Sequence, residues 1–202
     1  MKLILATLLI AVVVGFLNGG RLSNLSQLRI RWAPLALVGF AMQLVNPPGD
    51  WPLVMLLGSF VLLSIFAIAN VKTAGFAVIL IGVAMNFAVI AVNSGMPVSR
   101  QALIASGQAD TVDDLVNDAD SYVKHHLADA DDRVLFLGDV IALAPPVAQA
   151  VSVGDFYTYG GVAVVIIAAM RRRPDEAADT VTATETATMR RGAPGEVPSV
   201  SG

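Results

Sequence analysis

The sequence predicts an all-α membrane protein with five short transmembrane helices and an extracytoplasmic hairpin that is re-entrant or interfacial. Hydrophobic residues make up 55% of its 202 residues and charged residues only 14%, against roughly 25% charged residues in a soluble domain. Lysine and arginine are absent from residues 3–20, 32–71 and 73–99. Helices on the surface of a soluble fold need a charged face toward water, so we expect these stretches to lie in lipid.

Five apolar stretches are the expected helices of one membrane domain that covers residues 1–172. They lie at about residues 3–18, 32–46, 51–70, 74–93 and 155–171. A helical span takes about 20 residues, so the first, second and fifth stretches are short and need snorkelling side chains at their ends. The first stretch could also be a signal peptide, but no A-x-A-like cleavage site follows it, so we expect it to be retained.

The remaining segments differ from these helices in composition. Residues 94–133 form a polar exterior loop with eight aspartates and both histidines. Residues 134–153 are apolar but contain Asp139 and Pro145-Pro146. A carboxylate near a helix centre costs about 2.5–3.5 kcal/mol and a mid-helix proline roughly 3 kcal/mol, so we expect a re-entrant segment or an interfacial hairpin there. Residues 174–202 have no apolar period, which predicts a disordered cytoplasmic tail.

The distribution of basic residues predicts the topology. With five spans and the amino terminus outside, the cytoplasmic segments contain nine of the thirteen basic residues, namely Arg21, Arg29, Arg31, Lys72, Arg171, Arg172, Arg173, Arg190 and Arg191. A sixth span at residues 134–153 would move the first four of these to the outside. Because cytoplasmic loops carry the excess of Lys and Arg, we expect an outside amino terminus and a cytoplasmic carboxyl terminus.

Small and amide residues share one face of the fourth stretch. Asn86 and Asn93 lie seven residues apart, and Gly75 and Gly82 fall on the same face. Small residues allow close helix packing, and buried amides bond between helices. The pattern predicts a packed interface, with a polar pocket at Asn93 as the alternative. The run Asn93-Ser94-Gly95-Met96-Pro97 ends the helix, unless its irregular backbone lines a cavity.

Asp139 and Asp155 flank the apolar hairpin segment. Ionisable groups at membrane depth are functional candidates by default. Each also has a structural interpretation, because Asp139 could start a short helix and Asp155 could cap the fifth apolar stretch.

His125 and His126 raise the question of a metal site. Adjacent histidines cannot share one helix face, and the nearby aspartates do not specify zinc, so a solvated loop is the better interpretation. The sequence contains no cysteine and no P-loop, GxGxxG, GxSxG or HExxH motif. Its net charge is −3 and it lacks a basic stripe. We expect no metal, no cofactor and no nucleic-acid partner.

Three short elements carry a family resemblance. They are Asn93-Ser94-Gly95-Met96-Pro97-Val98 after an apolar helix, Leu137-Gly138-Asp139, and Gly154-Asp155 before the last helix. In this combination the chain resembles a family of small bacterial membrane proteins that is classified as a domain of unknown function. The resemblance covers roughly residues 1–172 and implies a bacterial plasma-membrane protein of a high G+C Gram-positive organism. It also implies one shared extracytoplasmic site, formed by Asn93, Met96, Pro97, Asp139 and Asp155.

These observations favour a non-enzymatic accessory or scaffold component of the membrane. Its partner would be a membrane lipid, another membrane protein or a second copy of the chain, bound at the extracytoplasmic face. The first four stretches carry no charge, which leaves few candidates for an ion path, and no inverted repeat is visible. Two alternatives stay open: a small transporter or channel subunit with pore-facing Asn86 and Asn93, and a membrane-embedded enzyme that uses Asp139, Asp155 and His125.

The absence of cysteine gives the topology a direct test. We expect a cysteine introduced by Asp120→Cys to react with a membrane-impermeant maleimide in intact cells, because residue 120 is predicted to lie outside. Lys72→Cys should react only after the cells are permeabilised. The reverse labelling pattern would contradict the predicted topology.

Overall fold

Five helices dominate the structure, a computed structural model that describes residues 2–45, 47–49, 51–117 and 124–171. They are α1 (Lys2–Leu17), α2 (Ala33–Leu44), α3 (Trp51–Ala69), α4 (Phe76–Asn93) and α7 (Val153–Met170), with a 3-10 helix η1 (Leu22–Gln27) between α1 and α2. Each helix begins and ends within two residues of the stretch expected from the sequence. The expected tail at 174–202 lies outside the described residues.

Three of these helices, α3, α4 and α7, are long and apolar enough to cross a membrane. The other two are apolar but shorter, with 16 residues in α1 and 12 in α2. A span needs about 17 residues or more unless the bilayer or the flanking side chains adapt. The structure therefore has three helices of spanning length and composition, together with two shorter apolar helices.

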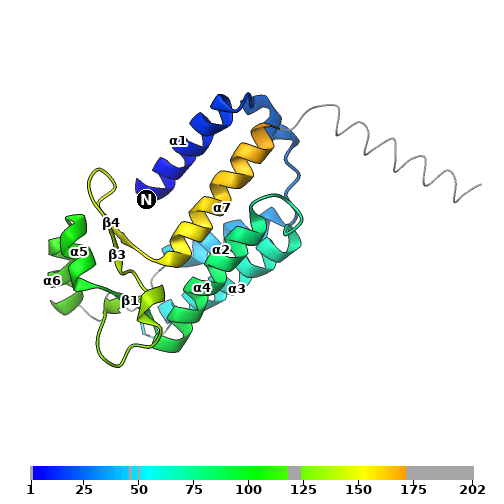
Figure 1. Cartoon of the computed structure of the whole chain (residues 1–202). Coiled ribbons are helices and arrows are strands. Elements are labelled where there is room, and N and C mark those ends of the chain that lie inside the picture. The colour runs from blue at the N-terminus through cyan, green and yellow to red at the C-terminus, as the bar shows by residue number, and fades with distance from the viewer. Residues whose placement is uncertain (1, 46, 50, 118–123, 172–202) are drawn as a thin grey trace, which may run out of the picture.

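The helices pack one against the next in the order α2, α3, α4, α7 and α1. This row is curved, since residues of α1 and α2 line the same cavity, and Figure 1 shows α2 behind α4 and α7. Neighbours run antiparallel along the row except for α1 and α7, whose carboxyl ends lie together. The backbone N–H of Arg21 donates to the carbonyl of Met170 at 2.9 Å there, and Gly15 lies against the Met170 side chain.

The charged residues are distributed unevenly between the two ends of the helices, because one end carries basic residues and none of the described acidic ones. At one end, the Asn70 side chain, directly after α3, bonds to the segment that precedes α2. It accepts from Arg31 N and donates to Arg31 O, both at 2.8 Å. The described basic residues of that end are Arg21, Arg29, Arg31, Lys72 and Arg171. Residues 94–117 and 124–152 lie at the other end and are named the polar unit here (Figure 1). The described aspartates all lie at this second end.

The contact between α4 and α7 is close because glycines face it from both helices. Gly82 lies against Gly154, and Gly75 lies against Gly161. A Cβ atom on Gly161 would come within 2.6 Å of Ile79 Cγ1 and 2.7 Å of Ile79 N, closer than van der Waals contact allows. The small-residue face expected in the fourth stretch is thus a helix–helix interface.

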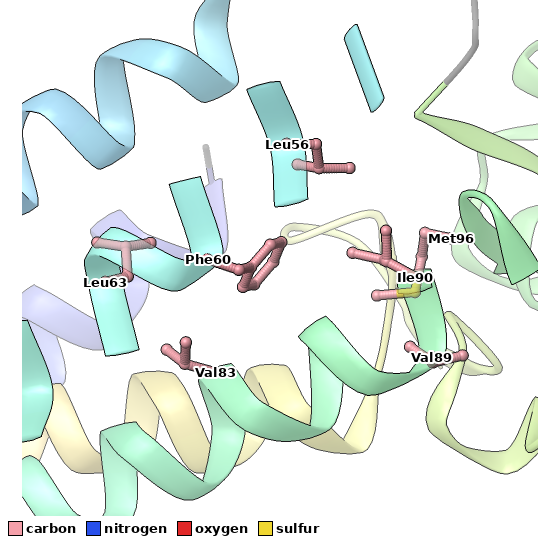
Figure 2. Packing of buried hydrophobic residues seen from close by; sticks show 7 residues of the cluster. All are labelled: Leu56, Phe60, Leu63, Val83, Val89, Ile90 and Met96. Carbon is pink, nitrogen blue, oxygen red and sulfur yellow. The ribbon is translucent and has the colours of Figure 1, made fainter. Parts of the chain in front are cut away.

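The main apolar cluster joins α3, α4 and the first strand, as Figure 2 shows. Its buried members are Leu56, Phe60, Leu63, Val83, Val89, Ile90 and Met96. Burial of one large aliphatic or aromatic side chain contributes about 1.5–3 kcal/mol. Because Met96 belongs to the polar unit, this cluster also fixes that unit to the bundle.

The polar unit combines short helices with short strands. Its elements are β1 (Met96–Val98), α5 (Arg100–Ser106), α6 (Ala109–Asn117), β2 (His125–Leu127), the 3-10 helix η2 (Leu135–Leu137), β3 (Ile141–Leu143) and β4 (Gln149–Val151). β1 pairs with β2 in parallel, and β3 pairs with β4 antiparallel. The Ser99 hydroxyl caps α5 by accepting from Ala102 N at 3.3 Å. A small core of its own includes Leu103, Val112 and Leu115.

Two sequence-based expectations need correction here. The chain is mostly helical but not all-α, since the described part of the polar unit has four strands. Each is three residues long, too short for a period of two to be visible in the sequence. Asp139 does not start a helix. It lies in extended backbone bridged to Val98, and the segment beyond it forms a hairpin of β-strands.

Candidate functional site

The start of α7 is fixed by two reciprocal hydrogen bonds. The Ser152 hydroxyl accepts from Asp155 N at 3.0 Å, and the Asp155 carboxylate accepts from Ser152 N at 3.1 Å. This capping box satisfies backbone donors that the first turn of a helix leaves without partners. Asp155 therefore has the capping role that the sequence suggested as its structural interpretation.

The same two side chains also bind Asn86 of α4. Asn86 Nδ2 donates to Asp155 Oδ1 at 2.9 Å, and Ser152 Oγ donates to Asn86 Oδ1 at 2.9 Å. Asn86 is only 6% exposed and Ser152 is fully buried. These three residues are named the polar link here. Loss of one partner in such a buried network leaves the others unsatisfied, which costs about 1–3 kcal/mol per group.

Sequence reasoning missed Ser152, although a signal for it was present. A Ser three residues before an acidic residue, directly ahead of an apolar helix, is the pattern of a capping box, and Ser152 and Asp155 have that spacing. The partnership with Asn86 had no comparable signal, because the two elements are far apart in the chain.

Backbone hydrogen bonds hold Asp139 in place, whereas one oxygen of its side chain has no partner among the described residues. Its N–H donates to Pro97 O and its carbonyl accepts from Ser99 N, both at 3.0 Å. Its Oδ1 atom is buried and has no hydrogen-bond partner within the described part of the chain. Desolvation raises the pKa of Asp139 well above its ordinary value, and the nearby Asp155 carboxylate raises it further.

His125 lies on β2, in register with Met96 of β1. The residue is exposed, yet protein encloses enough of the ring that desolvation lowers its pKa, and the charge of Lys124 lowers it further. Its neighbour His126 points elsewhere and binds Asp132 at 2.8 Å. No three His, Asp or Glu side chains of the described residues approach closely enough to hold a metal ion.

Asp139 and His125 share one cavity in the polar unit, named the polar-unit pocket here. Its volume is about 210 Å³, and Gln108, Thr111 and Gln149 contribute further polar groups to its wall. The apolar part of the wall comes from Val98, Leu103, Leu115 and Ala150. The sequence indicated Asp139 and His125 but gave no reason to join them to the two glutamines.

The three other sequence-predicted site residues support the site without lining it. Asn93 donates to Arg133 O at 2.9 Å and accepts from Arg133 N at 2.8 Å, so it anchors a loop. Met96 and Pro97 are buried in β1. The structure thus joins Asn86 to Asp155 and Asp139 to His125, while Asn93 stands apart from both pairs.

A second, larger cavity lies between the bundle helices and is named the groove here. It has a volume of about 390 Å³ and receives side chains from all five helices. Most of its wall is apolar, with Phe40, Phe60, Leu63, Ile79 and Val162 among the lining residues. Its polar groups are Gln43, Asn86, Asp155, Thr158 and Tyr159, which gather at the end next to the polar link.

Lys124 links the polar unit to the carboxyl end of α2 by hydrogen bonds. Its Nζ donates to Gln43 O at 2.7 Å and to Val45 O at 2.9 Å. These carbonyls lie at the helix carboxyl terminus, where a cation is favourable. Partial burial lowers the pKa of Lys124.

The sequence from residue 27 to 167 matches a family of unknown function, DUF5317. The chain belongs to this family. The match includes the whole polar link, the polar-unit pocket and the groove apart from α1. It confirms the expectation of a family of unknown function. No curated protein and no solved structure matches the chain.

The two cavities offer different groups to a ligand. Both Asp155 oxygens already accept hydrogen bonds from Asn86 and Ser152. A general base must instead have an oxygen or nitrogen within reach of a substrate proton. The groove offers apolar surface with a polar end, and the polar-unit pocket offers hydrogen-bonding groups around one unpaired carboxyl oxygen.

The raised pKa of Asp139 predicts a pH-dependent stability. Because the folded pKa lies above the unfolded value near 3.8, the contribution of Asp139 is fully present below pH 3.8 and is lost as pH rises through the folded pKa. We expect Asp139→Asn to match the unmodified protein near pH 3.8 and to be more stable at pH 7, as measured by thermal unfolding in detergent.

The exposed Asp131→Asn serves as the matched control and should give no pH-dependent difference. His125, whose lowered pKa removes stability as pH falls below 6.5, acts equally in all three proteins and cancels. Parallel curves for Asp139→Asn and the unmodified protein would contradict the burial of this carboxyl group.

Proposed function

We propose that this protein is a non-enzymatic component of the bacterial plasma membrane that binds a lipid in the groove between its helices. The observation that carries the proposal is the groove, a cavity of about 390 Å³ with an apolar length and one polar end. Small-ligand sites have volumes of roughly 300–1,000 Å³ and combine apolar walls with a few polar groups. The groove has both properties.

The position of the groove favours a lipid as its occupant. Its walls include α3, α4 and α7, the three helices long and apolar enough to cross a membrane. A cavity at that depth is surrounded by hydrocarbon chains, and its phenylalanine, leucine and valine side chains offer no hydrogen bonds to water. A lipid tail would fill this space at little cost.

The polar end restricts the head group that fits. Of the groove-lining residues that the structure describes, none is Lys, Arg or His, and the charged member is Asp155. An anionic phosphate would therefore meet a carboxylate and no cation. We infer a lipid whose uncharged or cationic head group lies at this polar end, beside the Asp155 carboxylate.

The proposal includes the topology expected from the sequence, with five spans, the amino terminus outside and the polar unit on the extracytoplasmic face. The end of the bundle with Arg21, Arg29, Arg31, Lys72 and Arg171 has none of the described acidic residues, whereas the other described basic residues lie among the aspartates. This supports a cytoplasmic position for the first end, because the excess of Lys and Arg belongs in the cytoplasm. Long arginine side chains at the basic end would allow the shorter α1 and α2 to span. An accessory or scaffold role for the polar unit, toward a partner protein or a second copy, belongs to the same proposal.

The two alternatives are less well supported by these contacts. A channel would need pore-facing amides, but Asn86 is engaged by Ser152 and Asp155, and Asn93 by Arg133. An enzyme could not rely on Asp155, because both its oxygens accept hydrogen bonds within the fold. Asp139 and His125 would have to carry the chemistry without it.

Val162→Trp tests the proposal, because Val162 lines the groove and a larger side chain would occupy it. We expect the purified variant to carry about tenfold less lipid, which corresponds to roughly 1.4 kcal/mol of lost binding, as measured by native mass spectrometry from mild detergent. Val164→Trp is the control, since Val164 lies two residues away, is 43% exposed and does not line the groove.

Equal lipid on both variants, or none on the unmodified protein, would contradict the proposal. A stoichiometric protein that co-purifies without lipid would instead favour the scaffold role alone. Thermal unfolding of each variant shows whether it has folded before the lipid contents are compared.

A further inference from the structure

We propose that the polar-unit pocket is a binding site for a small organic cation, a primary ammonium compound, with Asp139 as its counter-ion. This site is separate from the groove, and its argument does not depend on the lipid. It rests on the enclosed carboxyl oxygen, the surrounding donors and acceptors, and the sign of the nearby charges.

The Asp139 Oδ1 atom is the group that requires a ligand. It is covered by protein and, among the described residues, no donor reaches it, although the side chain lines a cavity of about 210 Å³. A buried carboxylate oxygen without a donor is costly, and a charge-assisted hydrogen bond is its strongest compensation. An ammonium group in the cavity, beside the Asp139 side chain that lines it, would compensate the negative charge of this carboxyl group.

The charges around Asp139 favour a cation over an anion. The Asp155 carboxylate is close enough to raise the Asp139 pKa, and burial acts in the same direction. A bound ammonium would offset both effects at once. Two cations lie nearby, but Lys124 is committed to Gln43 O and Val45 O, and the lowered pKa of His125 favours its neutral form.

The other polar groups of the pocket suit an ammonium compound that also carries a hydroxyl. The side-chain oxygen Oε1 of Gln108 accepts from Ala150 N at 2.9 Å, which fixes that side chain against β4. Thr111 and Gln149 line the same wall and can donate to or accept from a ligand hydroxyl. His125 is exposed, so the pocket is open to solvent on its side.

The rigidity of the wall supports a preformed site. Gln149 and Ala150 are on β4, paired with β3, and His125 is on β2, paired with β1. Asp139 itself is held on both sides by backbone hydrogen bonds to Pro97 and Ser99. A pocket built on paired backbone pays less ordering entropy when it binds.

The test is thermal unfolding of the full chain in detergent with ethanolamine hydrochloride, at neutral pH and constant ionic strength. Ethylene glycol, the uncharged analogue of similar size, and sodium chloride are the parallel additives. At tenfold excess over Kd we expect ethanolamine to raise the Tm by about 3–6 °C, with no rise from the other two. Asp139→Asn should weaken the apparent affinity at least about tenfold, whereas the exposed Asp131→Asn should not.

Equal effects of ethanolamine and sodium chloride would overturn the proposal without any variant, so it stays testable even if Asp139→Asn fails to fold. An ethanolamine effect that persists in a folded Asp139→Asn would also overturn it. A result of either kind leaves the lipid in the groove untouched, because Val162→Trp reports on that site alone.

Discussion

The structure depends on the close approach of α4 and α7. Glycines at Gly75 and Gly82 of one helix face Gly154 and Gly161 of the other, and side chains at these positions would collide with opposing backbone or side-chain atoms. Lipid offers no hydrophobic drive for two helices to associate, so packing and interhelical hydrogen bonds must do it. Since α3 with α2 packs beside α4, and α1 packs beside α7, this one contact sets the whole row and the groove within it.

The polar link extends the same contact to the polar unit. Ser152 directly follows β4, so its bonds to Asn86 and Asp155 attach the β-hairpin to two membrane helices. Met96 in the apolar cluster and Lys124 at the end of α2 provide two further attachments. The polar-unit pocket is therefore built on a unit with several fixed points on the bundle, which keeps Asp139 and His125 in place.

The sequence predicted what depends on local pattern. Long charge-free runs gave the five helices, the spacing of Gly75, Gly82 and Asn86 gave the packed face, and Asp155 was recognisable as a helix cap. The strands were not predictable, because three residues show no alternation and their pairing is set by distant partners such as His125 for Met96.

The sites were predictable only in part, for the same reason. Asn86, Asp139, Asp155 and His125 were indicated as rare polar groups in an apolar chain, yet their grouping required tertiary structure. Gln108, Gln149 and Tyr159 are ordinary residues in sequence terms and acquire meaning only from the cavities that they line. Asn93 shows the opposite case, since a conspicuous motif residue proved to anchor the loop at Arg133.

The most direct measurement of the α4–α7 contact compares Gly161→Ala with Gly160→Ala. The new methyl group of Gly161→Ala would meet Ile79 at 2.6 Å, whereas nothing lies within 4 Å of the corresponding position at Gly160. Unfolding in detergent should show Gly161→Ala destabilised by about 1–3 kcal/mol, and Gly160→Ala unchanged or stabilised by up to about 1 kcal/mol through helix propensity. Equal stability of the two variants would contradict the central role of this contact.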